Sequence, residues 1–90
     1  MTDVARHLTI HGRVQGVFFR DSCRAEAQRL GVRGWVSNEP DRTVQAWLEG
    51  DPDAVDPLVT WCRQGPPRAQ VERVEISEVV PEGYSGFEVR

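Results

Sequence analysis

The chain has 90 residues and a mass of 10.2 kDa, the size of one small domain. Hydrophobic residues make up 39% and charged residues 28%, which excludes a disordered protein. The net charge of −3 argues against a nucleic-acid binder, and the lack of a signal-peptide pattern or of an apolar run near about 18 residues argues against export or membrane insertion. We therefore expect one cytoplasmic domain over residues 1–90.

The first third of the chain predicts a strand, a loop and a helix. Residues 5–12 alternate apolar and polar side chains, which is typical of a half-buried strand. Residues 13–19 contain too little periodicity to be regular and are predicted as a loop. Apolar residues then recur every three or four positions over residues 20–30, which indicates a helix that ends at Gly31.

A hairpin and a second helix follow. Apolar and polar patterns over residues 32–38 and 43–49 flank turn residues and predict two adjacent strands. Gly50-Asp51-Pro52 supplies a break, an N-cap and a proline for the first helical position. The helix that these residues begin is expected to end at Gly65. Pro57 indicates either a kinked first turn or a later start of this helix, after residue 56.

The last segments predict strands over residues 71–80 and 86–90. The order of elements predicts an α+β fold of the ferredoxin-like, split βαβ type, a mainly antiparallel sheet with two helices on one face and a short extra C-terminal strand. The expected order of its four longer strands is 4-1-3-2.

The second face of the predicted sheet is expected to meet solvent. Trp35 and Trp47 fall on that face, partly exposed or under the terminal strand. Four polar residues are also predicted to point outward there: His7, Thr9, Gln45 and Glu49.

No metal site is predicted. Cys23 and Cys62 lack the spacing of a zinc site and are interpreted as buried thiols. His7 and His11 share a strand face without a third ligand and are interpreted as solvated. We expect no metal and no other cofactor.

The clearest chemical signal is the segment from Gly12 to Arg20, with the sequence GRVQGVFFR. A glycine-bearing loop before a helix can gather main-chain N–H groups around an anion, and Arg20 can add a bidentate contact. The segment therefore predicts a site for phosphate or carboxylate. No lysine or hydroxyl follows Gly16, so a nucleotide with magnesium is not indicated. The alternative is a tight turn whose Arg20 pairs with a surface carboxylate.

This loop resembles the phosphate-binding loop of the acylphosphatase family, G-x-V-Q-G-V-x-[FY]-R. The segment from Gly31 to Asn38 is similar to the family's G-x-x-G-[WY]-V-x-N. The likeness covers nearly the whole chain and includes further matches: Asp41, Val44, residues 65–67, residues 71–74, and Gly86-Phe87. Because no zinc-finger-like cysteines follow, a complete, free-standing domain is expected.

The resemblance implies an acylphosphatase, which hydrolyses carboxyl-phosphate mixed anhydrides to a carboxylate and inorganic phosphate without a metal or a covalent intermediate. It implies that Arg20 binds the phosphoryl oxygens and that Asn38 orients the attacking water. The implied partners are a small-molecule acyl phosphate and inorganic phosphate, with no nucleic acid and no membrane, and the chain is expected to be a monomer. The implied phosphate-binding residues are Gln15, Gly16, Val17, Phe18, Phe19 and Arg20.

The sequence also departs from the family pattern. Arg42 and Gln45 stand where the family commonly has glycine and glutamate, and loss of the glycine is expected to change the hairpin turn. Arg90 stands where many members have an aromatic or apolar residue. Two alternatives to a free-standing enzyme are a non-catalytic anion- or partner-binding module and the acylphosphatase-like domain of larger carbamoyl-phosphate-using proteins. The presence of Arg20 and Asn38 favours the enzyme.

Overall fold

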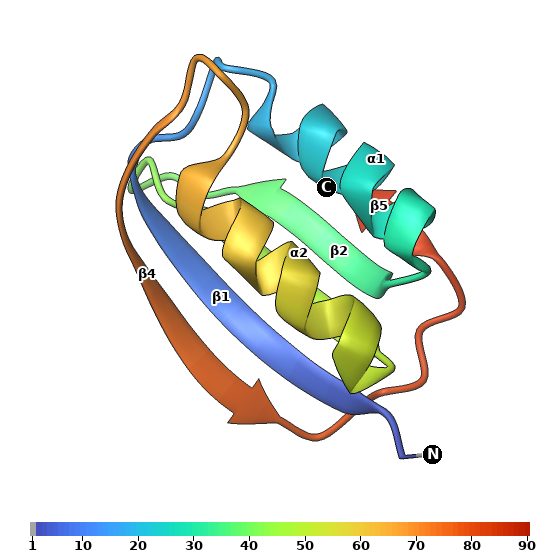
Figure 1. The fold of residues 1–90 in the computed structure, drawn as a ribbon. Coiled ribbons are helices and arrows are strands. Elements are labelled where there is room, and N and C mark those ends of the chain that lie inside the picture. Colours follow the sequence, from blue (N-terminus) through green and yellow to red (C-terminus); the bar gives the residue numbers. More distant parts are fainter. Residues whose placement is uncertain (1) are drawn as a thin grey trace.

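A computed structural model describes residues 2–90 of the chain. Two helices cover one face of a five-stranded sheet, and both run roughly along the strands (Figure 1). The elements are β1 (Val4–Arg13), α1 (Phe19–Leu30), β2 (Arg33–Asn38), β3 (Val44–Gly50), α2 (Pro52–Gln64), β4 (Gln70–Val79) and β5 (Phe87–Val89).

The sheet has the strand order β4-β1-β3-β2-β5, which confirms the predicted order of the four longer strands. β1 pairs antiparallel with β3 and β4, and β2 pairs antiparallel with β3. β5 adds to the free edge of β2 as a parallel strand, with Gly34 beside Phe87. The ferredoxin-like prediction is therefore confirmed, including the short extra strand.

The core lies between the sheet and the two helices. Leu8 and Ile10 of β1 are fully buried there, as the alternation in the sequence predicts. Cys23 and Cys62 are buried free thiols, which confirms their interpretation. The neighbouring Cys23 thiol, together with burial, raises the pKa of the Cys62 thiol. The remaining core side chains are Val14, Val17, Phe19, Ala27, Val32, Val36, Val44, Ala46, Leu48, Val55 and Leu58.

The residues predicted to end α1 and to begin α2 do so in the structure, but Pro57 has neither of the effects predicted for it. Gly31 ends α1 with φ +79°, and the Asp51 side chain accepts a hydrogen bond from the Asp53 N–H at 2.8 Å at the start of α2. α2 begins at Pro52 and continues through Pro57. Both expectations for Pro57 are therefore wrong. Proline is tolerated there because its ring is exposed and only one hydrogen bond of the helix is lost.

The outer face of the sheet is less open to solvent than predicted. Trp35 and Trp47 are half-buried, as expected, but they are covered by the connection between β4 and β5 (residues 80–86). Trp35 Nε1 donates to the Tyr84 hydroxyl at 3.2 Å, and the Tyr84 ring lies 6.0 Å from that of Trp47. His7, Thr9 and Gln45 are likewise only half-buried.

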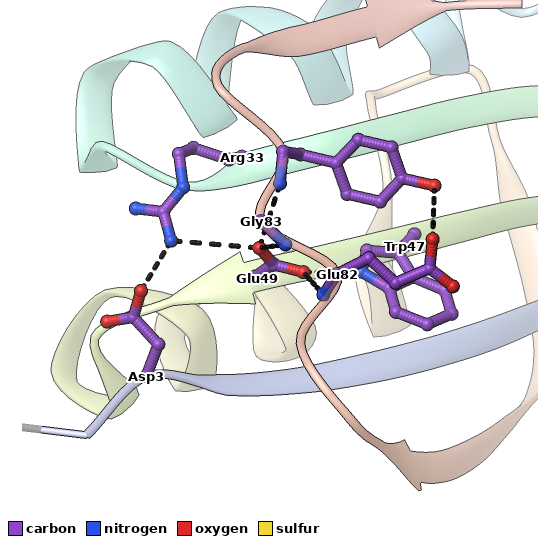
Figure 2. A network of polar contacts seen from close by, with 7 residues as sticks. Asp3, Arg33, Trp47, Glu49, Glu82 and Gly83 are labelled. Atoms are coloured by element: carbon purple, nitrogen blue, oxygen red, sulfur yellow. Dashed lines mark hydrogen bonds and ion pairs between the residues drawn. The ribbon is translucent and has the colours of Figure 1, made fainter.

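Glu49 corrects the prediction most clearly, because its side chain is completely buried. Its carboxylate accepts hydrogen bonds from Trp47 Nε1 at 3.0 Å and from the main-chain N–H groups of Glu82, Gly83 and Tyr84 at 2.7, 2.8 and 3.1 Å (Figure 2). Arg33 Nη2 lies 3.8 Å away. Alternation assigns Glu49 to the outer face correctly, but it carries no information about the segment that folds over that face.

Candidate active site

A glycine-dependent bulge at the end of β1 starts the loop. The pairing of β1 with β4 shifts register between His11 and Gly12, and Gly12 has φ +125°. A Cβ atom at Gly12 would lie 2.1 Å from the Gln70 carbonyl oxygen, so no other residue fits. The bulge redirects the chain from the sheet toward the start of α1.

Two buried valines fix the loop on the core. Val14 and Val17 are almost completely buried, whereas Gly16 and Phe18 between and after them are exposed. Gly16 and Phe18 both have left-handed backbone conformations, with φ of +73° and +65°. Within the described residues 2–90, the main-chain N–H groups of residues 15–18 donate to no main-chain carbonyl. The loop therefore presents unused donors.

The N-terminus of α1 adds to this set of donors. Phe18 occupies the N-cap position, and no side chain caps the helix there. The N–H groups of a first helical turn have no partner within the helix, and they carry the positive end of the helix dipole. The start of α1 is thus suited to an anion.

The loop, the start of α1 and the end of β2 enclose a cavity of about 350 Å³. It brings together Arg20, from the first turn of α1, and Asn38, the last residue of β2. Gly16, Phe18 and Phe19 also line it, together with Val14 and Asp21. Five of the predicted site residues therefore share one cavity, and Gln15 and Val17 are not among its lining residues.

Gln15 has a role that the sequence does not reveal. Its Nε2 donates to the main-chain oxygens of Glu39 at 2.8 Å and Thr43 at 3.0 Å. The side chain thus ties the loop to the β2–β3 turn, directly after Asn38. Both N–H groups of the side chain are used, and the main-chain N–H is the donor left for a ligand. The sequence gives one hint of this role, because Gln15 places an amide with two N–H donors among apolar loop residues.

Asn38 carries an unusual oxygen atom. Its Oδ1 is buried and has no hydrogen-bond partner within residues 2–90. Burying an acceptor without a partner costs about 1–3 kcal/mol. Its main chain is held by pairing with Val44 of β3, so the side chain is fixed at the cavity wall.

The guanidinium of Arg20 is positioned by a hydrogen bond to the main chain. Its Nη1 donates to the main-chain oxygen of Arg90 at 3.0 Å, and among residues 2–90 no Asp or Glu carboxylate lies within ion-pair distance of it. Within the described residues, the structure therefore does not pair Arg20 with a surface Asp or Glu, which is the pairing that the alternative of a tight turn favours. Most of the N–H groups of the guanidinium are left for a ligand.

The turn after Asn38 contains the first departure from the family pattern. Arg42 has φ +74°, a left-handed conformation that favours glycine, so the turn holds arginine at a conformational cost. Asp41 Oδ1 accepts hydrogen bonds from the Thr43 hydroxyl at 2.6 Å and the Thr43 N–H at 3.0 Å, and these hold the pKa of Asp41 below its usual value. At the second departure, Gln45 Oε1 lies 3.2 Å from His7 Nε2.

Neither a metal centre nor a membrane-spanning helix occurs in the part of the chain that the structure describes. Across residues 2–90, no three His, Cys, Asp or Glu side chains gather as a metal ion would need. Nor does any helix in that range have the length and apolar character to cross a membrane.

Comparisons with known proteins agree with this geometry. The sequence model of the family described as Acylphosphatase matches residues 6–89. A protein named Acylphosphatase from Thermococcus kodakarensis is 56% identical over 89 residues, which cover 99% of this chain and 98% of that protein. Another of that name, from Thiobacillus denitrificans, is 60% identical over 84 residues, 93% of each chain. The solved structure of an acylphosphatase from Coxiella burnetii has a TM-score of 0.94 at 42% identity, covering 98% of this chain and 93% of that one.

Proposed function

The chain belongs to the acylphosphatase family and hydrolyses acyl phosphates, and we propose that Arg20, Asn38 and the main-chain N–H groups of residues 15–20 carry the reaction. The observation that carries this assignment is the shared cavity. One wall supplies the Arg20 guanidinium and the free main-chain N–H groups of Gly16 and Phe18, and another supplies the side chain of Asn38.

The loop and Arg20 bind the phosphoryl group in this proposal. The N–H groups of residues 15–18 and of the first turn of α1 surround its oxygens, and the guanidinium of Arg20 neutralises their charge. Charge stabilisation of this kind contributes most where charge builds up in the transition state. The contact with Arg90 holds the guanidinium in place before the substrate arrives.

Asn38 acts on the water in this proposal. Its side-chain amide, which can both accept and donate a hydrogen bond, holds a water molecule and directs the water oxygen at phosphorus. The new P–O bond forms as the bond between phosphorus and the acyl oxygen breaks. The carboxylate leaves with the electron pair, and the water proton passes to the phosphate product. Because a carboxylate is a good leaving group, no strong base and no metal are needed.

Replacing Arg20 tests this assignment. Arg20→Ala should lower kcat/KM for acetyl phosphate by a factor on the order of 10³ or more, because it removes the cation that binds the phosphoryl group. Arg20→Lys should restore little, since it lacks the planar fork. The measurement is release of phosphate, with a phosphate monoester as the control substrate. Near-normal kcat/KM for Arg20→Ala would show that the loop is assigned wrongly.

The metal-free part of the proposal has its own test. Exhaustive chelation with EDTA should leave the hydrolysis of acetyl phosphate unchanged. Loss of activity followed by recovery with an added divalent ion would contradict it.

We also propose that the enzyme works as a monomer in the cytoplasm. One chain supplies both Arg20 and Asn38, so no second copy is needed to complete the site. The two buried thiols, Cys23 and Cys62, suit a reducing compartment. Light scattering should give the mass of a single chain, and a dimer would contradict the proposal.

A further inference from the structure

A second cavity adjoins the candidate active site. It has a volume of about 470 Å³ and is lined by Gly12, Arg13, Val14, Gln15 and Arg42. Val14 lines both cavities, so the two are neighbours at the start of the loop. We call the second one the Arg13–Arg42 cavity. It lies between the end of β1 and the β2–β3 turn.

The charged residues that line this cavity are both arginines. Among residues 2–90, no carboxylate lies within ion-pair distance of either one. The acidic side chains of the turn bond elsewhere, Asp41 with Thr43 and Glu39 with the Ser37 hydroxyl. The chain has a net charge of −3, but this cavity is locally positive because its two arginines have no ion-pair partner among the described residues.

The two sides of the cavity are held as one unit. Gln15 bridges them through its hydrogen bonds to the main chain of Glu39 and Thr43. Arg13 sits on the bulged end of β1, opposite Gln70 of β4. Arg42 keeps its left-handed conformation within this support. Two unpaired arginines that line one cavity are an arrangement that a bound anion would stabilise.

We propose that the Arg13–Arg42 cavity binds a second anionic group on the acyl part of the substrate, namely a carboxylate at the far end of a dicarboxylic acyl phosphate. This inference rests on the proposed function, because it requires the phosphoryl group to sit at the loop and Arg20. Arg13 and Arg42 then determine specificity and take no part in breaking the bond.

The test compares two substrates of equal chain length, hexanedioyl monophosphate and hexanoyl phosphate, at low salt. Arg42→Gln and Arg13→Gln should each lower kcat/KM for the dicarboxylic substrate by about three- to tenfold, mainly through KM. Both variants should keep kcat/KM for hexanoyl phosphate within about twofold, which also shows that they are folded. The preference for the dicarboxylic substrate should weaken in high salt.

Arg29→Gln is the matched control, because it removes the same charge about 14 Å along α1 from Arg20. It should leave the preference unchanged. Equal losses on both substrates, or the same effect from Arg29→Gln, would overturn the proposal by showing a general effect of charge.

Free hexanedioate separates the substrate from a second ligand. Inhibition that requires Arg42 is expected, because the free carboxylate competes for the same cavity. If free hexanedioate instead raises kcat for hexanoyl phosphate and this activation requires Arg42, the cavity is a regulatory site for free anions and the proposal is wrong. Failure of the proposed function would look different, because neither substrate would then be hydrolysed in a manner that depends on Arg20.

Discussion

Asn38 and Glu49 lie at opposite ends of the β2–β3 hairpin, and both carry a buried side-chain oxygen. The carboxylate of Glu49 accepts four hydrogen bonds, three of them from consecutive main-chain N–H groups (Figure 2). The oxygen of Asn38 accepts none within residues 2–90. One end of the hairpin is therefore built to hold the fold together, and the other end is left open for a ligand.

The contrast has an energetic meaning. A buried acceptor without a partner destabilises the fold by about 1–3 kcal/mol, so a site such as Asn38 is tolerated when something outside the chain supplies the missing donor. A buried carboxylate that accepts several N–H groups stabilises the segment that donates them. Stability and activity should therefore respond in opposite ways when these two residues are changed.

The largest effect is expected at Asn38. Asn38→Ala should lower kcat for acetyl phosphate by a factor on the order of 10²–10³, because it removes the group that orients water. The free energy of unfolding should change by less than about 1 kcal/mol, since the lost oxygen has no partner in the fold. Steady-state kinetics and denaturant titration measure the two quantities. A variant that unfolds easily would show that Asn38 is structural.

Glu49→Gln should show the reverse pattern. The free energy of unfolding should fall by about 2–4 kcal/mol, because the amide has one acceptor oxygen where the carboxylate has two. Measured on folded protein, kcat should stay within about threefold of the unchanged enzyme. Glu75→Gln is the control, since Glu75 is an exposed carboxylate on β4 and should change stability by less than about 1 kcal/mol. Equal losses for both variants would contradict the role of Glu49.

Low pH should reduce the stabilisation of the fold that the Glu49 carboxylate provides. Burial raises the pKa of Glu49, but the hydrogen bonds from Glu82, Trp47, Gly83 and Tyr84 outweigh it and leave the pKa below its usual value. The pKa of Glu49 is lower in the folded protein than in the unfolded chain. Its contribution to stability is therefore complete above about pH 4.3, the ordinary pKa of glutamate, and is lost as the pH falls through the pKa of the folded protein.

The gap in unfolding free energy between the unchanged protein and Glu49→Gln should therefore narrow below about pH 4. Glu26 and Asp41 also have lowered pKa values, but both proteins contain them, so their contributions cancel in the difference. A gap that stays constant down to about pH 2 would show that the charge of Glu49 contributes nothing.

The smallest effect is expected in the turn beside Asn38. Arg42→Gly should raise the free energy of unfolding by up to about 1 kcal/mol, because glycine adopts φ +74° without strain. The greater conformational entropy of glycine in the unfolded chain offsets part of this gain. Denaturant titration measures the shift. A loss of stability would show that the arginine side chain makes contacts that outweigh the strain.

The sequence predicts the fold well because its signals are local. Alternation locates β1, Gly31 ends α1, and Gly50-Asp51-Pro52 begins α2. The burial of Glu49 could not be predicted, because three of its four hydrogen-bond donors lie 33 to 35 residues later in a segment without regular structure. The resemblance selects Arg20 and Asn38, and the structure brings them to one cavity. The two hydrogen bonds of the Gln15 side chain depend on a turn that is distant in sequence.

The most direct test of the central claim is the affinity for inorganic phosphate, measured by calorimetry on Asn38→Ala alongside its kinetics. If the side chain of Asn38 acts on water and not on the phosphoryl group, phosphate should bind within about threefold of normal. At the same time kcat should fall by a factor on the order of 10²–10³. Arg20→Ala, measured in parallel, should lose phosphate binding. Loss of phosphate binding in Asn38→Ala together with activity would place Asn38 in the anion site and contradict its role in orienting water.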